Sequence, residues 1–247
     1  MGNIALPKNV KFEKTKKENN TIVEIGPCFP GFGVTLGNSI RRVLLSSMPG
    51  AAPIGVVIEG VEHEFMALSH LKEDVLEFVL NLKQLRMKIH GDEPVELELD
   101  IAGKKEITAG DITKNSQVEI MNPDLVLGHI TDMAGSLKAK IFAKKGMGFE
   151  AVENREEKEK IVNFIEMDSV YSPVKHVGIT VENARVGKMT NWDKVVLDII
   201  TDGTISPEEA FNKSVDILVE QFGALVGGAK EEKKEDKKEE DAKEEEK

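Results

Sequence analysis

Hydrophobic residues recur at helical spacing in two segments of the first half of the chain. Residues 36–47 carry an apolar stripe on one face, and Pro49 with Gly50 predicts the end of this helix. Residues 71–85 carry a second stripe and predict a second helix. The stripes consist of Leu36, Ile40, Val43, Leu44 and Ser47 in the first segment and Leu71, Val75, Leu76, Val79 and Leu82 in the second.

A third helix is predicted over residues 207–226. Ser206 supplies an N-cap, Pro207 the residue favoured in the first turn, and Glu209 the acidic partner that completes a capping box. A regular apolar seam follows, and a seam of this kind usually packs against another helix, often from a second chain. Its members are Phe211, Val215, Leu218, Phe222 and Leu225.

Alternation of apolar and polar residues predicts strands elsewhere. It is clearest over residues 95–101, where Val, Leu and Ile alternate with acidic side chains, as in a strand with one buried face. Several short strands are predicted from there to about residue 149. Further extended segments are predicted over residues 11–25, 56–64, 174–186 and 192–204.

The composition fits a protein of one large or two modest domains. The chain has 247 residues, of which 40% are hydrophobic and 5% aromatic, so aliphatic side chains must fill the core. No run of about 18 apolar residues occurs, which excludes a transmembrane helix, and the N-terminal residues lack the pattern of a secretory signal. Cys28 is the single cysteine, which excludes a disulfide framework and a multi-cysteine zinc site. These features predict a reducing, cytoplasmic compartment.

The chain carries a net charge of −11, most of it outside the C-terminal tail. Residues 229–247 hold seven Lys against ten Asp and Glu, so the tail contributes −3 and the body −8. Phosphate binding needs a concentrated basic surface, so we expect no direct DNA binding by this acidic body. The tail has no apolar residue larger than Ala and nothing to bury, so it is predicted to be disordered.

The candidate motifs predict no catalytic, metal or cofactor site. The glycines of residues 31–37 suggest a phosphate-binding loop before a helix. The segment lacks the Gly-Lys-Ser/Thr ending of a P-loop and the context of a dinucleotide site, so a glycine-permitted entry into the helix is the better interpretation. The five histidines form no HxxxH or HExxH pair. Cys28 has no nearby basic residue that would activate it as a nucleophile.

Arg41 and Arg42 lie on the first predicted helix, away from its apolar stripe. Such a pair is either solvated surface or part of an interface, since arginine suits planar, bidentate contacts between proteins. The spacing alone favours neither interpretation.

A series of motifs extends over nearly the whole body of the chain, roughly residues 12–226. The longest is GFGVTLGNSIRRVLLSSMPG at residues 31–50. It is followed by IEGVEHEF, EDVLEFVLNLK, ITAGDIT, VEIMNPD, KKGMGF, YSPV, NARV and the block from WDK to TDGTISPEEA. This long, unbroken pattern resembles the signature of the alpha subunit of bacterial DNA-directed RNA polymerase.

The resemblance implies an α+β fold of two domains. A discontinuous dimerisation domain, residues 1–49 and 173–228, would combine an antiparallel sheet with two amphipathic helices. Residues 50–172 would form an inserted, mostly-β domain. The implied dimer interface lies on the two helices and consists of Phe32, Leu36, Ile40, Val43, Leu44, Phe211, Val215, Leu218, Phe222 and Leu225.

The resemblance also implies a function, that of a non-catalytic assembly subunit. It would form a homodimer and hold the beta and beta-prime subunits together for DNA-templated transcription. The catalysis of this nucleotidyltransferase, and any metal or cofactor, would belong to the partners. By the family pattern Arg42, with Arg41 beside it, contacts the beta subunit. The further implied contacts with the large subunits, in part with beta-prime, are Glu77, Lys83, Asp193 and Lys194.

One departure from the family pattern concerns DNA. Family members usually continue past a flexible linker into a second globular domain that binds upstream promoter DNA and activators, whereas residues 229–247 form a Lys/Glu tail. We therefore expect neither DNA recognition nor activator docking from this chain. The alternative from another class of function is a small nucleotide-dependent enzyme that uses the GFGVTLGNS loop at residues 31–39.

Overall fold

The computed structural model describes residues 4–103, 105–155 and 161–244, and the surroundings of side chains as far as Val226. It combines helices with antiparallel strands, which confirms the α+β fold class. Within this part of the chain, none of the helices has both the length and the apolar character that crossing a membrane requires.

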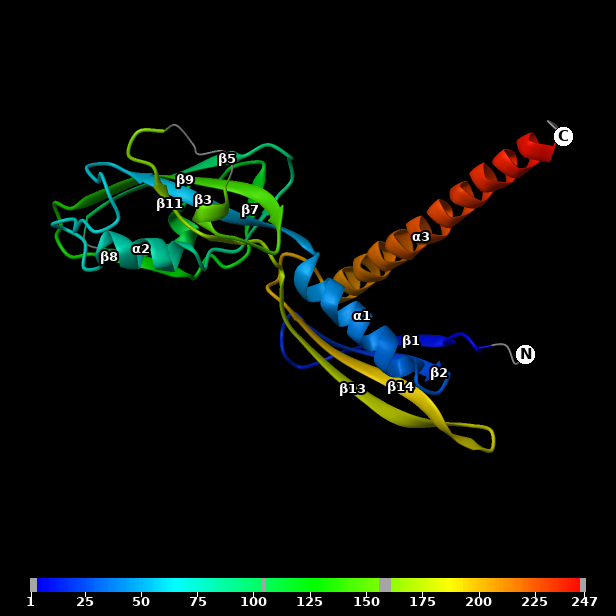
Figure 1. The fold of residues 1–247 in the computed structure, drawn as a ribbon. Helices are drawn as coiled ribbons and strands as arrows, with labels where there is room; N and C mark the ends of the chain where they lie inside the picture. Colours follow the sequence, from blue (N-terminus) through cyan, green and yellow to red (C-terminus); the bar gives the residue numbers. More distant parts are fainter. Residues whose placement is uncertain (1–3, 104, 156–160, 245–247) are drawn as a thin grey trace.

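Two lobes and a long projecting helix make up the molecule (Figure 1). The terminal lobe is built from residues 9–46 and 174–226, and the central lobe from residues 49–170. Each lobe has a hydrophobic core of its own. The chain therefore passes from the terminal lobe to the central lobe and back again.

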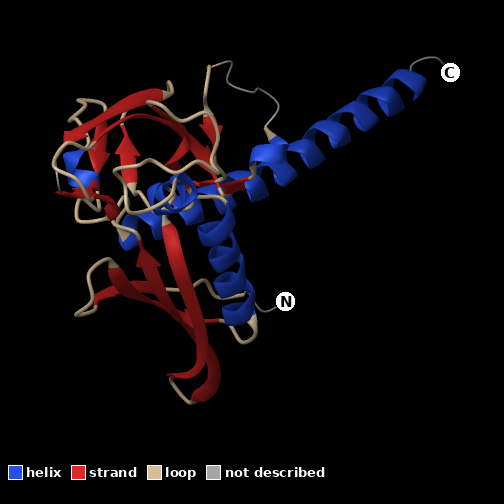
Figure 2. Ribbon diagram, turned by 90° about the vertical axis from the view of Figure 1, so that its left-hand side faces the viewer, coloured by secondary structure: helices blue, strands red, loops and turns tan. Residues whose placement is uncertain are grey.

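The terminal lobe is a four-stranded antiparallel sheet with helices packed against it (Figure 2). The strand order is β1-β2-β14-β13. The N-terminal and C-terminal segments of the lobe therefore pair in one sheet, with Ile25 of β2 opposite Val195 of β14. α1 packs on β13 and β14, and the start of α3 packs on β14 and β2. The elements are β1 (Asn9–Lys14), β2 (Asn20–Cys28), α1 (Phe32–Ser46), β13 (Val174–Val186), β14 (Met189–Thr201) and α3 (Pro207–Glu244).

Two glycines allow α1 to lie close to this sheet. A Cβ at Gly33 would come 2.7 Å from the Cβ of Asp193, and a Cβ at Gly37 would overlap the side chain of Ile179. Gly31, at φ 84°, permits the tight entry into the helix that the sequence predicts. The glycines of this motif therefore serve the packing of α1 against β13 and β14.

The last helix begins as the sequence predicts. The Ser206 hydroxyl accepts a hydrogen bond from the N–H of Glu209 (3.2 Å), and the Glu209 carboxylate accepts one from the N–H of Ser206 (3.3 Å), which completes the capping box. α3 continues to Glu244, whereas we expected disorder from residue 229. Lys and Glu at a spacing of four residues are compatible with a helical backbone. Residues 245–247 of the expected tail lie outside the described residues.

The central lobe consists of small antiparallel sheets around one core. Its main sheet has the order β11-β3-β9-β5, and three ladders, β4-β7, β6-β8 and β10-β12, complete it. α2 buries Phe78 and Leu82 in this core. The elements are β3 (Pro49–Ile58), α2 (Val75–Leu82), β4 (Met87–Ile89), β5 (Val95–Ala102), β6 (Lys105–Thr108), a 3-10 turn (Ala109–Asp111), β7 (Val118–Ile120), β8 (Val126–Ile130), β9 (Ser136–Met147), β10 (Phe149–Glu150), a second 3-10 turn (Val152–Asn154), β11 (Ile165–Glu166) and β12 (Ser169–Val170).

α2 is shorter than the predicted helix over residues 71–85. The side chain of Asp74 caps it by accepting a hydrogen bond from the N–H of Glu77 (2.7 Å), so the helix starts at Val75. Leu71 instead forms a bridge to Ile130 of β8. The apolar stripe in the sequence thus begins four residues before the helix does.

The strands follow the prediction where one face is exposed. β5 alternates between buried and exposed residues throughout, as the pattern at residues 95–101 predicts. β3 covers Pro49–Ile58 and differs from the predicted 56–64, because its middle is buried on both faces and shows no alternation. The extended segment at residues 11–25 is two strands, β1 and β2, joined by a turn.

Candidate functional site

Asp193 lies at the N-terminus of α1 and closes the glycine loop. Its Oδ2 atom accepts hydrogen bonds from the backbone N–H groups of Gly31 (2.9 Å) and Gly33 (3.0 Å). Amides of this kind are the groups that a phosphate binds at a helix N-terminus. The chain's own carboxylate occupies that position, so the geometry supports the structural interpretation of the loop over a nucleotide site.

We expect Asp193→Ala to lower the free energy of unfolding by about 1–2 kcal/mol, because it removes the acceptor for two helix-terminal amides and a negative charge near the positive end of the helix dipole. Urea denaturation of the purified chain measures the loss. Asp193→Asn is the matched control and should lose less, since its side-chain oxygen still accepts a hydrogen bond. Equal stability of Asp193→Ala and the wild type would contradict the capping role.

Lys194 joins three strands of the terminal lobe. Its Nζ atom lies 2.9 Å from a carboxylate oxygen of Glu182 on β13 and 3.1 Å from one of Glu24 on β2. The hydrogen bonds to Glu182 and Glu24 raise the pKa of the Lys194 ammonium. Asp193 and Lys194 thus both have interaction partners within the chain. If either residue contacts another subunit, it must share its hydrogen bonds or ion pairs with that subunit or give them up.

The two adjacent arginines of α1 lie in different environments. The Nε–H of Arg41 donates to the carbonyl of Val177 on β13 (3.0 Å), which ties the helix to the sheet. Arg42 is exposed, and within the described part of the chain its side chain has no hydrogen-bond or ion-pair partner. Arg42 is therefore the one of the pair that can meet another molecule without breaking an internal contact.

Glu77 and Lys83 lie at opposite ends of α2. Glu77 is exposed in the first turn. Lys83 is half-buried, and its Nζ atom lies 2.8 Å from Oδ2 of Asp168. This hydrogen bond, together with one from the N–H of Val152, lowers the pKa of the Asp168 carboxyl. Glu77 is thus available at the surface, whereas Lys83 joins α2 to the segment between β11 and β12.

The predicted dimer residues divide into three groups by their exposure in the single chain. The first group, buried in the core of the terminal lobe, consists of Ile40, Leu44 and Phe211. The second group, partly buried against that core, consists of Leu36, Val43, Val215 and Leu218. The third group, exposed, consists of Phe32, Phe222 and Leu225. A second chain can therefore reach the residues of the third group and the exposed atoms of the residues in the second group.

Exposed apolar side chains continue along α3 past the core of the terminal lobe. Val219, Phe222, Leu225 and Val226 are 65%, 59%, 70% and 57% exposed, and we call them the α3 surface. The seam predicted from the sequence does not include Val219 and Val226, although they lie three residues before and four residues after Phe222, on the same side of the helix. A row of uncovered apolar residues is typical of an interaction surface.

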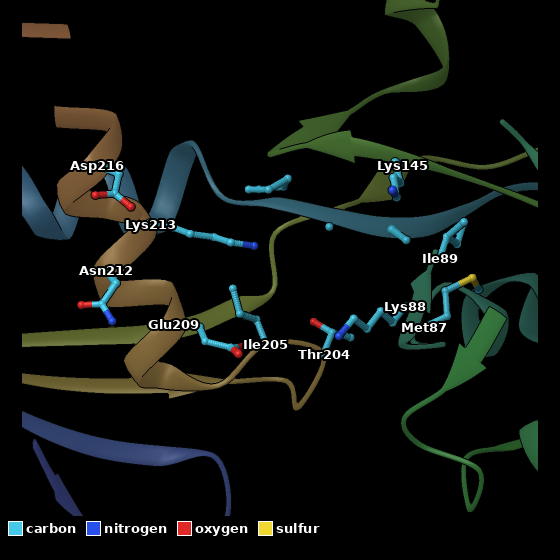
Figure 3. A pocket seen from close by; sticks show the side chains of 13 residues that line it. Met87, Lys88, Ile89, Lys145, Thr204, Ile205, Glu209, Asn212, Lys213 and Asp216 are labelled. Atoms are coloured by element: carbon cyan, nitrogen blue, oxygen red, sulfur yellow. The ribbon is translucent and has the colours of Figure 1, made fainter. Parts of the chain in front are cut away.

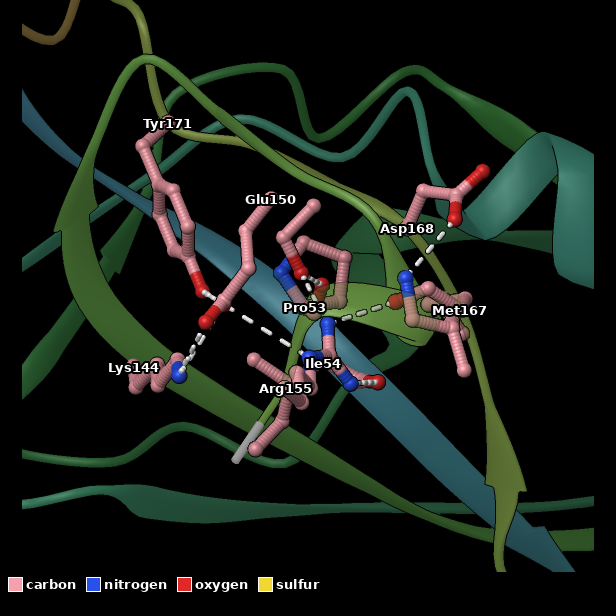
Figure 4. A network of polar contacts seen from close by, with 10 residues as sticks. Pro53, Ile54, Lys144, Glu150, Arg155, Met167, Asp168 and Tyr171 are labelled. Carbon is pink, nitrogen blue, oxygen red and sulfur yellow. Dashed lines mark hydrogen bonds and ion pairs between the residues drawn. The ribbon is translucent and has the colours of Figure 1, made fainter. Parts of the chain in front are cut away.

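A polar network around Arg155 joins several strands of the central lobe (Figure 4). The guanidinium donates hydrogen bonds to the carbonyls of Ile54 (2.7 Å) and Met167 (2.6 Å) and to the hydroxyl of Ser169 (2.8 Å). Its Nε atom lies 3.5 Å from Oε2 of Glu150, and the side chain is 6% exposed. The network therefore holds β3 and β10 against the segment that carries β11 and β12.

Glu150 is the second centre of this network. It accepts a hydrogen bond from the Tyr171 hydroxyl (2.7 Å) and forms an ion pair with Lys144 (3.0 Å). Partial burial by itself raises the pKa of Glu150, but the hydrogen bonds from Tyr171 and Lys144 and the charges of Lys144 and Arg155 lower it on balance. Burial and the hydrogen bond to Glu150 raise the pKa of Tyr171. The network thus stabilises an ionised Glu150 beside a neutral Tyr171.

A cavity of about 510 Å³ lies where the two lobes meet. Figure 3 shows its lining, with side chains of α3 on one side and of β4 on the other. The lining mixes both charge signs, including Lys88, Lys145, Lys213 and Glu209. Glu209 belongs to the capping box and Lys145 pairs with Asp92 (3.0 Å), so these two groups serve the local structure.

Cys28 is buried in the terminal lobe, with its Sγ atom 3.8 Å from the carbonyl oxygen of Ile25. Burial, and then the charge of Asp193, raises the pKa of the Cys28 thiol. A buried, protonated thiol is inert, in agreement with the sequence interpretation. Among the residues that the structure describes, no three His, Cys, Asp or Glu side chains are grouped to hold a metal ion.

Comparison with known proteins identifies the family. A family model described as the RNA polymerase Rpb3/RpoA insert domain matches residues 56–172. The DNA-directed RNA polymerase subunit alpha of Oceanobacillus iheyensis is 41% identical over 226 residues, which cover 88% of this chain and 72% of the relative. The chain belongs to the alpha subunits of DNA-directed RNA polymerase. Those of Desulforamulus reducens and Staphylococcus aureus strain Newman are 44% and 42% identical over 86% and 88% of this chain, and the matches cover 68% of each relative.

As an alpha subunit, this chain is a member of the RNA polymerase complex, a nucleotidyltransferase that transcribes DNA. The resemblance that the motifs indicate is confirmed. The match at residues 56–172 falls on the central lobe, whose core is separate from that of the terminal lobe. In this alpha subunit the exposed residues among the predicted contacts include Arg42, Glu77, Phe32, Phe222 and Leu225.

Proposed function

We propose that this alpha subunit is a non-catalytic assembly subunit, which forms a homodimer and then holds the beta and beta-prime subunits of RNA polymerase. The observation that carries the proposal is the α3 surface, a row of exposed large apolar side chains on a helix that projects from the lobe (Figure 1). Association removes such side chains from water and is favoured by the hydrophobic effect. Catalysis, and any metal or nucleotide site, would then belong to the large subunits.

The proposed dimer uses α1 as well as α3. Phe32 and Val34, at the start of α1, are 39% and 53% exposed. Each copy therefore offers apolar side chains on both helices, and in a two-fold dimer each surface is used twice. An obligate interface of this kind buries on the order of 2,000 Å² or more, which both helices of both copies would have to supply together.

A symmetric dimer can bind two unlike large subunits if each copy uses a different patch. Arg42 on α1 is our candidate for the contact with beta, since it is exposed and has no internal partner in the described chain. The candidates for further contacts with the large subunits, in part with beta-prime, are Glu77, Lys83, Asp193 and Lys194. The single, buried Cys28 fits assembly in the reducing cytoplasm.

We expect Arg42→Ala to leave folding and the dimer intact but to weaken binding of the beta subunit by about tenfold or more. The side chain is exposed, so its loss opens no cavity. Co-purification with untagged beta and beta-prime, alongside a thermal melt and sedimentation, measures these effects. Arg185→Ala, the same change at another exposed position of the terminal lobe, is the control. Unchanged binding of beta by Arg42→Ala would show that this residue has no interface role.

A further inference from the structure

Two lysines point into the cavity between the lobes without serving the local structure. Lys88 extends from β4 of the central lobe and Lys213 from α3, and their side chains point toward one another across the cavity (Figure 3). Within the described part of the chain, neither ammonium group has an ion-pair or hydrogen-bond partner. Two positive charges that face one another repel, whereas an anion between them would be attracted by both.

The other charged groups of the lining leave these two ammonium groups without a counter-charge. Lys145 pairs with Asp92 (3.0 Å), whose side chain is 100% exposed, so this ion pair is weak in water. The Glu209 carboxylate accepts a hydrogen bond from the backbone of its capping box (3.3 Å). Asp216 lies three residues after Lys213 on α3, and among the described residues neither acid forms an ion pair with a lysine of the lining. Three lysines against two acids thus give the cavity an excess of positive charge, although the chain as a whole is acidic.

Apolar residues from both lobes complete the lining of the cavity. They are Pro49, Ala51, Met87, Ile89 and Ile205. The volume of about 510 Å³ is that of a site for a small organic molecule, and an inorganic anion would fill only part of it. A site for a small molecule typically combines apolar walls with a few polar groups that fix the orientation of the ligand. The lining therefore suits an anion that carries an organic body.

We propose that this cavity binds a small phosphate monoester, with the phosphate between Lys88 and Lys213 and the organic body against the apolar lining. A phosphate monoester carries nearly two negative charges at neutral pH, which match two ammonium groups. Lysine binds phosphate well as a compact point charge. Because Lys88 belongs to the central lobe and Lys213 to the terminal lobe, the bound phosphate would link the two lobes. The site lies within a single chain and is independent of the proposed assembly function.

Isothermal titration calorimetry of the full chain with phenyl phosphate tests the site. We expect one molecule to bind per chain with a Kd below about 1 mM, and inorganic phosphate, which lacks an organic body, to bind more weakly. The double variant Lys88→Gln/Lys213→Gln should raise the Kd for phenyl phosphate by about tenfold or more, because it removes both facing charges. The melting temperature without ligand should not change, since both side chains are exposed.

The matched control is Lys138→Gln/Lys175→Gln, which removes two exposed lysines outside the cavity and changes the net charge by the same amount. It should bind phenyl phosphate as the wild type does. Equal losses of affinity in the two double variants would overturn the proposal, since the charge of the whole protein and not the cavity would then attract the anion. The proposal is also overturned if the wild-type chain shows no saturable binding of phenyl phosphate, or if inorganic phosphate binds as tightly.

Discussion

Replacement of Arg155 by methionine is expected to lower the free energy of unfolding by about 3–5 kcal/mol. The change removes the donors of hydrogen bonds to Ile54, Met167 and Ser169 and the positive charge that faces Glu150. The Arg155 side chain is 6% exposed, so water has little access to the carbonyl and hydroxyl groups that would lose their hydrogen-bond donors. Buried carbonyls without a partner, and a carboxylate with one counter-charge fewer, account for the loss.

Urea denaturation followed by circular dichroism measures this effect. Arg155→Lys keeps the charge but not the planar set of donors, and its stability should fall between those of Arg155→Met and the wild type. Lys140→Met is the control, because it breaks an ion pair with Glu96 (2.7 Å) whose two side chains are exposed, and it should change stability little. An Arg155→Met variant as stable as the wild type would refute the structural role of the network.

Phe222→Asp is expected to convert the proposed dimer into folded monomers. Phe222 is 59% exposed in the single chain, so an aspartate at this position would not be buried in the core of the monomer. In the dimer the same carboxylate would be buried among apolar side chains without a counter-charge, which should weaken association on the order of 1,000-fold or more. Sedimentation at micromolar concentration measures the dimer, and circular dichroism measures the fold.

The choice of position matters for this test. Phe65→Asp, the same change at an exposed phenylalanine of the central lobe, should remain dimeric and is the control. Leu36→Asp is less informative, although Leu36 belongs to the predicted interface, because this side chain packs against the core of its own chain. A wild-type chain that sediments as a stable monomer, or a Phe222→Asp variant that stays dimeric, would rule out dimerisation through the α3 surface.

The sequence predicts this structure best where neighbouring residues decide the outcome. The capping box of Ser206 and Glu209 forms as predicted, because its two partners lie within one helical turn. The alternating burial of β5 follows directly from the period of a strand. Gly31 adopts the positive φ that a tight entry into α1 needs. In each case the physical cause acts over a few residues, so the pattern alone reveals it.

Contacts between distant residues could not be predicted in this way. Asp193 accepts a hydrogen bond from Gly33 in the first turn of α1, 160 residues earlier, and nothing in the local sequence distinguishes it from the other acidic residues of the chain. Arg155 lies in a charged segment that gives no sign of burial, yet its partners are Ile54 on β3 and Met167 in the segment between β11 and β12. Such roles depend on which strands become neighbours, and that is decided by the topology of the whole fold.

The predicted dimer interface shows the same limit. Phe211 and Phe222 belong to one seam and are equivalent by spacing, but they are 5% and 59% exposed. The difference arises because the sheet of the terminal lobe lies under the start of α3 and does not extend beneath its later turns. Helical periodicity indicates which side of a helix is apolar, and the tertiary structure decides how much of that side the same chain covers.

The pairing of β2 with β14, which sets Ile25 opposite Val195, also orders events during protein synthesis. A chain growing on the ribosome releases residues 49–170 before the partner strand of β2 exists, so the central lobe is the first folding unit to be complete. Until β14 emerges, β2 has its sheet partner on one side alone, and α1 lacks the carboxylate that caps it. The cap of α1 is therefore completed only after β14 has been synthesised, and association through α1 and α3 is restricted to chains in which α3 has also been synthesised.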